Sequence, residues 1–98
     1  MIRVIIERRL AEGKEQDYQQ TMRKLKQKAS HFPGYLSGEI LVEHDEPRHW
    51  VILSNWDTLE HWQAWETSDA RKQTLEAISP MLDGDESIRV YRLALQPV

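Results

Sequence analysis

The stretch from His49 to Lys72, HWVILSNWDTLEHWQAWETSDARK, decides how the rest of the sequence is interpreted. It begins with an apolar run that suits a strand, passes through Asn-Trp-Asp-Thr at 55–58, and then places apolar residues at helical spacing. All 4 tryptophans of the chain lie in it, between Trp50 and Trp65. An indole is large and apolar, with one N–H that needs a partner when buried. The stretch therefore marks the centre of a core or the wall of a pocket.

The sequence before this stretch predicts a strand, a helix and a second strand. Residues 2–10 alternate, with Ile2, Val4 and Ile6 on one face. From residue 15 the period becomes helical, and Pro33-Gly34 ends the helix. The stripe of this helix consists of Tyr18, Met22, Leu25 and Ala29. In the second strand, 35–43, alternation predicts two faces: Leu36, Ile40 and Val42 on one, and Tyr35, Ser37, Glu39 and Leu41 on the other.

The remaining elements complete a known arrangement. A turn at 44–48 leads to a third strand at 49–55, and Asp57 or Thr58 caps a helix that continues, or restarts near Ser68, through Ile78. A last strand follows at 87–95. The order is βαββαβ, which predicts a ferredoxin-like α+β fold with an antiparallel sheet, both helices on one face and strands 1 and 3 in the middle.

Helices on one face leave the other face of the sheet uncovered. Apolar side chains are expected there as well: Ile5, Leu41, Leu53 and Tyr91. An exposed apolar patch of this kind usually marks an interface, so we expect a homodimer joined sheet to sheet.

Composition narrows the class of protein. A chain of 98 residues predicts one domain, 1–98, and the absence of cysteine excludes disulfides and thiolate metal sites. The net charge of −3 gives no attraction for nucleic acid, so the basic run at 23–28 is interpreted as a solvated helix face. No apolar stretch suits a signal peptide or a membrane span, so we expect a cytoplasmic protein that binds a small molecule.

Two acidic turns resemble metal sites only in part. The turn with His44, Asp45, Glu46 and His49 is too tight to hold four donors in one geometry. The segment 83–86 resembles the start of a calcium loop, but the twelfth position of that loop is Ala94, where an acidic residue is needed. No metal is predicted.

Three features together carry a family resemblance: Pro33-Gly34-Tyr35, Asn55-Trp56-Asp57, and Trp65 followed by Ser68-Asp69. With these features the chain resembles the antibiotic biosynthesis monooxygenase domain family of the dimeric α+β barrel superfamily. The resemblance implies a ligand pocket between the helices and the sheet of each subunit. Members include cofactor-free monooxygenases of polyphenols or quinols, haem-degrading enzymes and isomerases of signalling molecules.

The haem-degrading pattern does not fit. It needs an asparagine on the first strand and an iron-ligating histidine ten residues after a tryptophan of the second helix. Trp65 matches that tryptophan, but Leu75 stands where the histidine should be, and the first strand offers Ile6, Glu7 or Arg8. Leucine cannot ligate iron, so haem degradation is disfavoured.

The cofactor-free monooxygenases fit better. Their chemistry requires a base, a dry cavity and an oriented phenol. On this resemblance the catalytic residues are His61 as base and Trp65 as pocket wall, with no cofactor. The expected substrate-binding residues are Trp62, Arg71, His31 and Tyr35.

Plainer interpretations remain open. Trp62 is spaced from Leu59 as a core residue would be, and His31 suits the carbonyl end of a helix as a cation. The whole chain is also open to being a non-catalytic dimeric module that binds a small ligand or a partner protein. A third interpretation is an isomerase of a small polar carbonyl compound.

Overall fold

A computed structural model describes residues 1–95, so positions 96–98 of the predicted domain lie outside it. Residues 1–95 form four strands and three helices in a ferredoxin-like α+β arrangement, which confirms the predicted fold class. In order they are β1 (Ile2–Arg9), α1 (Glu15–Ser30), β2 (Tyr35–Glu43), β3 (Glu46–Trp56), α2 (Leu59–Glu66), α3 (Asp69–Ile78), the 3₁₀ turn η1 (Ser79–Met81) and β4 (Ser87–Arg92).

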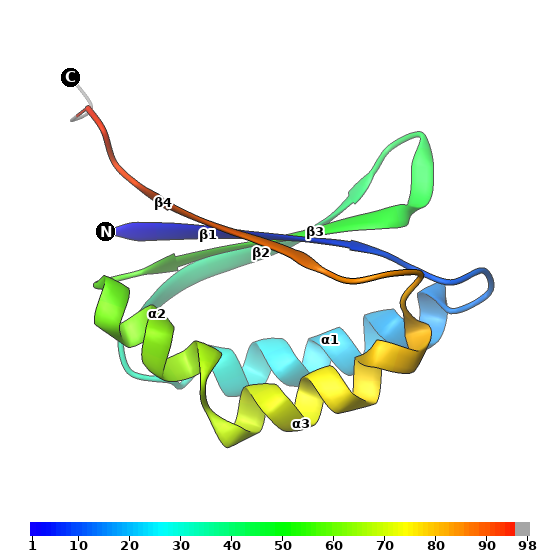
Figure 1. Ribbon diagram of the computed structural model, residues 1–98, viewed down its shortest axis with the longest axis horizontal. Coiled ribbons are helices and arrows are strands. Elements are labelled where there is room, and N and C mark those ends of the chain that lie inside the picture. Colours follow the sequence, from blue (N-terminus) through cyan, green and yellow to red (C-terminus); the bar gives the residue numbers. More distant parts are fainter. Residues whose placement is uncertain (96–98) are drawn as a thin grey trace.

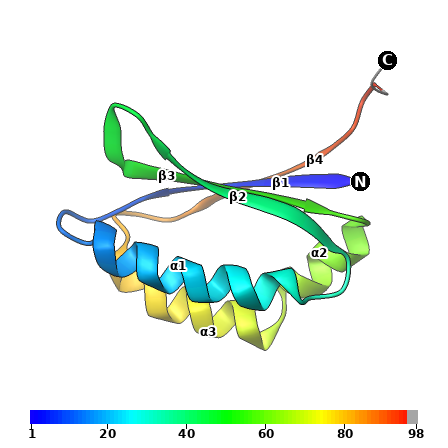
Figure 2. The same cartoon turned by 180° about the vertical axis from the view of Figure 1, so that it is seen from behind.

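The strands form one antiparallel sheet in the order β2-β3-β1-β4, so β1 and β3 are central as predicted. All three helices lie on the same face of the sheet (Figures 1 and 2). Val4 pairs with Ser54 on β3 and with Val90 on β4, which sets the register across the middle of the sheet. The helical layer and the sheet therefore enclose one core between them.

Two hydroxyl caps start the two C-terminal helices. The backbone N–H of His61 donates to Thr58 Oγ1 at 3.2 Å, and that of Arg71 donates to Ser68 Oγ at 3.3 Å. Such caps satisfy N–H groups that have no partner within the helix. The helical pattern after residue 58 therefore restarts at Ser68 and does not continue through it, which resolves the alternative that the sequence left open.

The core between sheet and helices has two clusters. One contains Trp56, Trp62 and Trp65 with Val4 and Ile6 of β1. The other contains Trp50 with residues of α1, α3 and the end of β1: Leu10, Tyr18, Met22 and Ile78. The tryptophan-rich stretch thus contributes to both clusters, and three of its indoles gather at one end of the sheet.

The alternation predicted for β2 was wrong at its first residues. The register shifts between Tyr35 and Ser37, because Tyr35 pairs with Trp56 while Ser37 pairs with Asn55. Leu36 is the extra residue of a β-bulge, and it is exposed. A bulge reverses which face the residues before it occupy. Tyr35 consequently packs against the core cluster of Trp56, on the helix side and not on the open face.

Two strand ends also differ from prediction. Glu43 pairs with Glu46, so the hairpin turn is shorter than expected and β3 begins before His49. A register shift accommodates Pro47, whose nitrogen has no hydrogen to donate, next to that pair. At the other end, β4 stops at Arg92, and residues 93–95 lie outside the strand.

The face of the sheet away from the helices carries apolar side chains, as predicted. Ile5 lies opposite Leu53, and Leu41 lies opposite Val51. Leu41 and Tyr91 are 42% and 45% exposed. The β2–β3 hairpin and the segment directly after β4 both rise on this side, so the face is bounded at two corners (Figures 1 and 2). Within residues 1–95, no helix has the length and apolar character to cross a membrane.

Candidate functional site

An apolar cavity lies between α1 and the β2–β3 side of the sheet. Its volume is about 50 Å³, and with the open space at its mouth it amounts to about 390 Å³. Ligand sites usually measure roughly 300–1,000 Å³. In this conformation the cavity admits a few water molecules, and an aromatic ring needs side chains to move. The lining residues that matter below are Met22, Lys26, Tyr35, Gly38, Trp56 and Trp65.

Aromatic rings form one wall of the cavity. Trp56 stacks on Trp65 with ring centroids 6.3 Å apart and an interplanar angle of 25°. Phe32 meets Trp65 edge-on at 5.2 Å. The indole N–H of Trp56 donates to Ser54 Oγ at 3.0 Å, so its polar atom is satisfied inside the core. The wall is therefore rigid and apolar, and it suits contact with a planar ring.

Tyr35 also lines the cavity, with its hydroxyl at Gly38. Its ring stands edge-on to Trp56, with centroids 5.4 Å apart, and its hydroxyl lies over Gly38, where a β-carbon would collide with it. Burial raises the pKa of Tyr35 above the ordinary tyrosine value of 10.0. The phenol therefore keeps its proton at neutral pH and can donate a hydrogen bond to a ligand oxygen.

His61 and His31 do not reach this cavity. The ring of His61 lies against Gly34, and its Nδ1 is 2.9 Å from Thr58 Oγ1. His31 is exposed at the end of α1, with its Nδ1 2.7 Å from the carbonyl oxygen of Gln27. Among residues 1–95, those that line the cavity include no histidine. The structure thus separates His61 from Trp65, although the two are one helical turn apart.

Arg71 and Trp62 lie elsewhere in the interior. Arg71 donates from Nη2 to Glu86 Oε1 at 2.9 Å, and its guanidinium carbon is 5.9 Å from the ring centroid of Trp62. Trp62 is 2% exposed and packs edge-on against Trp56, as a core residue does. Of the six residues predicted from the sequence, the structure brings together only Trp65 and Tyr35 at the cavity.

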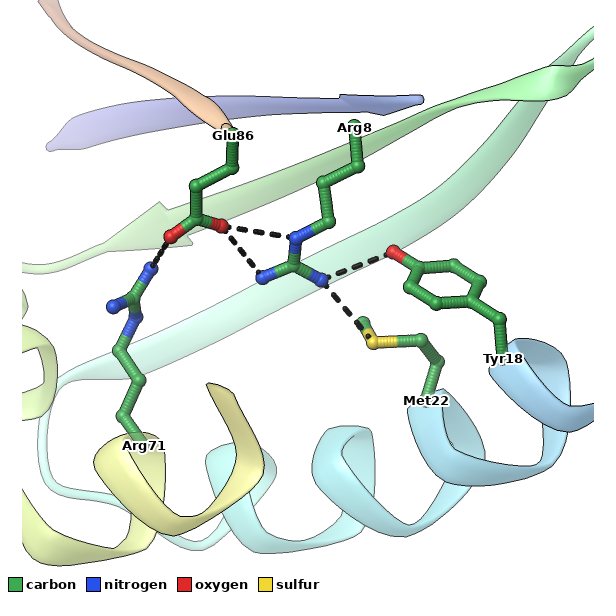
Figure 3. A network of polar contacts seen from close by, with 5 residues as sticks. All are labelled: Arg8, Tyr18, Met22, Arg71 and Glu86. Atoms are coloured by element: carbon green, nitrogen blue, oxygen red, sulfur yellow. Dashed lines mark hydrogen bonds and ion pairs between the residues drawn. The ribbon is translucent and has the colours of Figure 1, made fainter. Parts of the chain in front are cut away.

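A buried polar network (Figure 3) adjoins the cavity at Met22, which belongs to both. Arg8 of β1 donates from Nε and Nη2 to Glu86 Oε2, both at 2.9 Å, and from Nη1 to Tyr18 Oη at 3.0 Å and Met22 Sδ at 3.3 Å. Burial raises the pKa of Tyr18, and the nearby Arg8 charge partly opposes this. The side chains of Arg8 and Arg71 are 2% and 7% exposed, so the network holds two cations for one carboxylate.

Sequence reasoning missed Arg8 and Glu86. The signal for Arg8 was available, because it is the next even-numbered residue after Ile2, Val4 and Ile6, all of which were predicted to face one side. A charged residue at an inward position of a strand needs a buried partner. Its partner, Glu86, is 78 positions away and could not be identified from spacing.

No cluster of metal-binding groups was found in the described part of the chain. Over residues 1–95, no three His, Cys, Asp or Glu side chains gather as ligands of one ion would.

Known proteins share both the sequence pattern and the fold of this chain. Residues 1–77 match the sequence model of the family "Antibiotic biosynthesis monooxygenase". The chain is 22% identical over 88 residues to the "42.8 kDa protein in whiE locus" of Streptomyces coelicolor, a match that covers 90% of this chain and 22% of that protein. The chain thus spans less than a quarter of the length of this curated relative.

Two solved structures have the same fold. A protein from Deinococcus radiodurans assigned to the antibiotic biosynthesis monooxygenases superposes with a TM-score of 0.90 at 16% identity, covering 100% of this chain and 97% of that one. A mutant form of SnoaB from Streptomyces nogalater, a cofactor-independent oxygenase, superposes with a TM-score of 0.83 at 10% identity, covering 97% and 95%. At these identities the likeness establishes the fold alone. Because the family match extends over residues 1–77 of 98, the chain belongs to the antibiotic biosynthesis monooxygenase family.

Proposed function

We propose that this protein is a cofactor-independent monooxygenase that acts on a small aromatic or quinol-type substrate in the cavity beside Trp65. The observation that carries the proposal is the aromatic cavity of Trp56, Trp65 and Tyr35 in a chain of this family. The structural similarity to SnoaB, a cofactor-independent oxygenase, supports it.

The substrate itself would reduce the oxygen. A phenol that loses its proton becomes electron-rich and can pass electrons to oxygen. One oxygen atom then enters the ring as a quinone oxygen, and the other leaves as water with the two hydrogens that the phenol gives up. The substrate supplies all the electrons, so the protein has to favour deprotonation, orient the ring and exclude water.

Roles for the predicted residues follow from their positions. We assign Trp65 to contact with the substrate ring and Tyr35 to a hydrogen bond with a substrate oxygen, since both line the cavity. His61 packs against Gly34, next to Tyr35, and we assign it to positioning that turn. We assign Arg71 to positioning Glu86, with which it forms a hydrogen bond. We assign structural roles to Trp62, which is buried in the core, and to His31, which lies at the end of α1.

The proposed enzyme is a homodimer joined through the open face of the sheet. Supporting this is the row of apolar side chains on that face, which includes Ile5, Leu41, Leu53 and Tyr91. Apolar patches that extend over several strands are usually covered in an assembly.

Oxygen uptake tests the activity. Purified protein mixed with a panel of quinols and naphthols should consume oxygen faster than the uncatalysed rate. Trp65→Phe should lower kcat/KM by about tenfold to a hundredfold, because the ring loses its orienting wall. Trp50→Phe serves as the matched control, since it changes a buried indole in the other core cluster. Uptake at the uncatalysed rate with every compound would remove the enzymatic proposal.

The second candidate is a non-catalytic dimeric module that binds a small ligand or a partner. The volume of about 50 Å³ favours it, since the indoles fill most of the space between helices and sheet. Such a module would bind an aromatic compound without consuming oxygen, and no turnover would be lost in Trp65→Phe. The same assay therefore separates the two functions.

A further inference from the structure

Arg8 is a buried cation with its donors pointing in two directions. Toward β4 it meets Glu86, and toward α1 it meets Tyr18 and Met22 (Figure 3). Both oxygens of the Glu86 carboxylate form ion pairs, Oε2 with Arg8 and Oε1 with Arg71. The cluster therefore carries one positive charge more than it neutralises. A buried charge without compensation is unfavourable, so an anion near Arg8 would be held strongly.

Met22 separates this cation from the cavity. It lines the cavity, and its sulfur also accepts a hydrogen bond from Arg8 Nη1 at 3.3 Å. A thioether is a weak acceptor, and its side chain has three rotatable bonds. A negatively charged oxygen makes a shorter and stronger bond to a guanidinium. A ligand that brings such an oxygen can therefore replace Met22 as the partner of Arg8.

The cavity determines what kind of molecule brings the oxygen. Its wall of Trp56 and Trp65 suits a planar ring, and Tyr35 adds a third aromatic side chain to the lining. The charged residues that line it are Lys26 of α1 and Glu39 of β2, both exposed. Glu86 lies on the far side of Arg8, and Tyr18 lies beside Met22 on the side of α1. Arg8 is thus a buried cation that contacts the lining of the cavity through Met22.

We propose that Arg8 binds the deprotonated oxygen of a phenolic ligand once Met22 moves aside, so that the cavity selects aromatic anions over their neutral forms. The proposal rests on the cavity being the ligand site of the proposed function. It also gives the oxygenase a way to obtain its reactive phenolate, since a group that stabilises the anion makes deprotonation by water feasible without a histidine in the cavity. Arg8 would then be a catalytic residue, because it contacts the reacting molecule.

A coloured phenol tests this directly. The phenolate of 4-nitrophenol is yellow and the phenol is not, so absorbance reports its protonation state when bound. With saturating wild-type protein, the apparent pKa of 4-nitrophenol should fall by about one unit, as expected beside an opposite charge. Arg8→Met should abolish the shift. Arg9→Met is the matched control, because Arg9 is adjacent on β1 but exposed, and it should keep the full shift.

A second variant keeps the test decisive if Arg8→Met does not fold. Met22→Ala removes the side chain that separates Arg8 from the cavity, so this variant should bind 4-nitrophenolate several-fold more tightly than the wild type. A fall or no change in that affinity would overturn the proposal. So would loss of the shift in Lys26→Met with the shift retained in Arg8→Met, since the exposed lysine would then be the anion partner.

The outcome is separable from that of the oxygenase proposal, because no oxygen is measured. A shifted ligand pKa without turnover of any quinol supports the anion site and removes the oxygenase. Turnover of quinols without a shift in the ligand pKa supports the oxygenase and removes the anion site.

Discussion

The hydroxyl of Tyr35 lies over Gly38, in the space that the β-carbon of any other residue would need. On the other side of that space is the backbone carbonyl of Leu53, which would be 3.0 Å from such a carbon. Tyr35 reaches this place because the bulge at Leu36 turns it toward the helices. Glycine at position 38 is thus what admits the phenol to the floor of the cavity.

Replacing Gly38 with alanine should displace Tyr35. The new methyl group overlaps the phenol oxygen, so the free energy of unfolding should fall by about 1–3 kcal/mol, as for other overpacked sites. Urea unfolding of Gly38→Ala measures the cost, and the same substitution in a Tyr35→Phe background is the control. The cost should be smaller there because the overlapping oxygen is absent. Equal costs in the two backgrounds would contradict the contact.

Gly34 makes a comparable contact with His61. Gly34 and Gly84 both have positive φ, +84° and +94°, but only at Gly34 would a β-carbon collide, namely with the imidazole of His61. Gly84→Ala should therefore cost about 1–2 kcal/mol from backbone strain alone. Gly34→Ala should cost more, and His61→Ala should recover the difference. Thermal unfolding of the variants decides this, and similar costs at both glycines would mean that His61 does not hold the turn.

Alternation and helical spacing predicted most of the fold but only part of the site. The inward faces of β1 and α1 follow directly from residues such as Val4 and Met22. Tyr35 was assigned to the wrong face because a bulge adds one residue without any signal in alternation. His61 was paired with Trp65 because they are four residues apart. That spacing puts both on one side of α2, but the first turn of this helix lies over Gly34 and its second turn lies over the cavity.

Tyr18, in the buried network, makes the stability of the fold depend on pH in the alkaline range. Burial raises the pKa of Tyr18, while an unfolded tyrosine ionises near 10.0. The folded state therefore keeps this proton to higher pH than the unfolded state does. The resulting stability is complete below pH 10.0 and is lost as the pH rises toward the folded pKa. Urea unfolding on both sides of pH 10.0 should show a smaller loss for Tyr18→Phe than for the wild type. Equal losses would mean that Tyr18 does not contribute.

The proposed dimer depends on the centre of the open face. Ile5 lies on the central strand opposite Leu53, so Ile5→Lys would put a charge into the seam between two sheets. Sedimentation velocity should show a dimer for the wild type and a monomer for Ile5→Lys. Leu59→Lys is the control, because Leu59 is an exposed apolar residue on α2, away from the open face, and this variant should remain dimeric. A wild-type protein that sediments as a monomer would overturn the proposed interface.

A crystal structure of the protein with bound 4-nitrophenol would show directly where the ligand binds. We expect the ring between α1 and the β2–β3 side of the sheet, in contact with Trp65, with Met22 moved and the phenolate oxygen on Arg8. A ring bound outside this cavity, with Met22 still on Arg8, would contradict the assignment of the site.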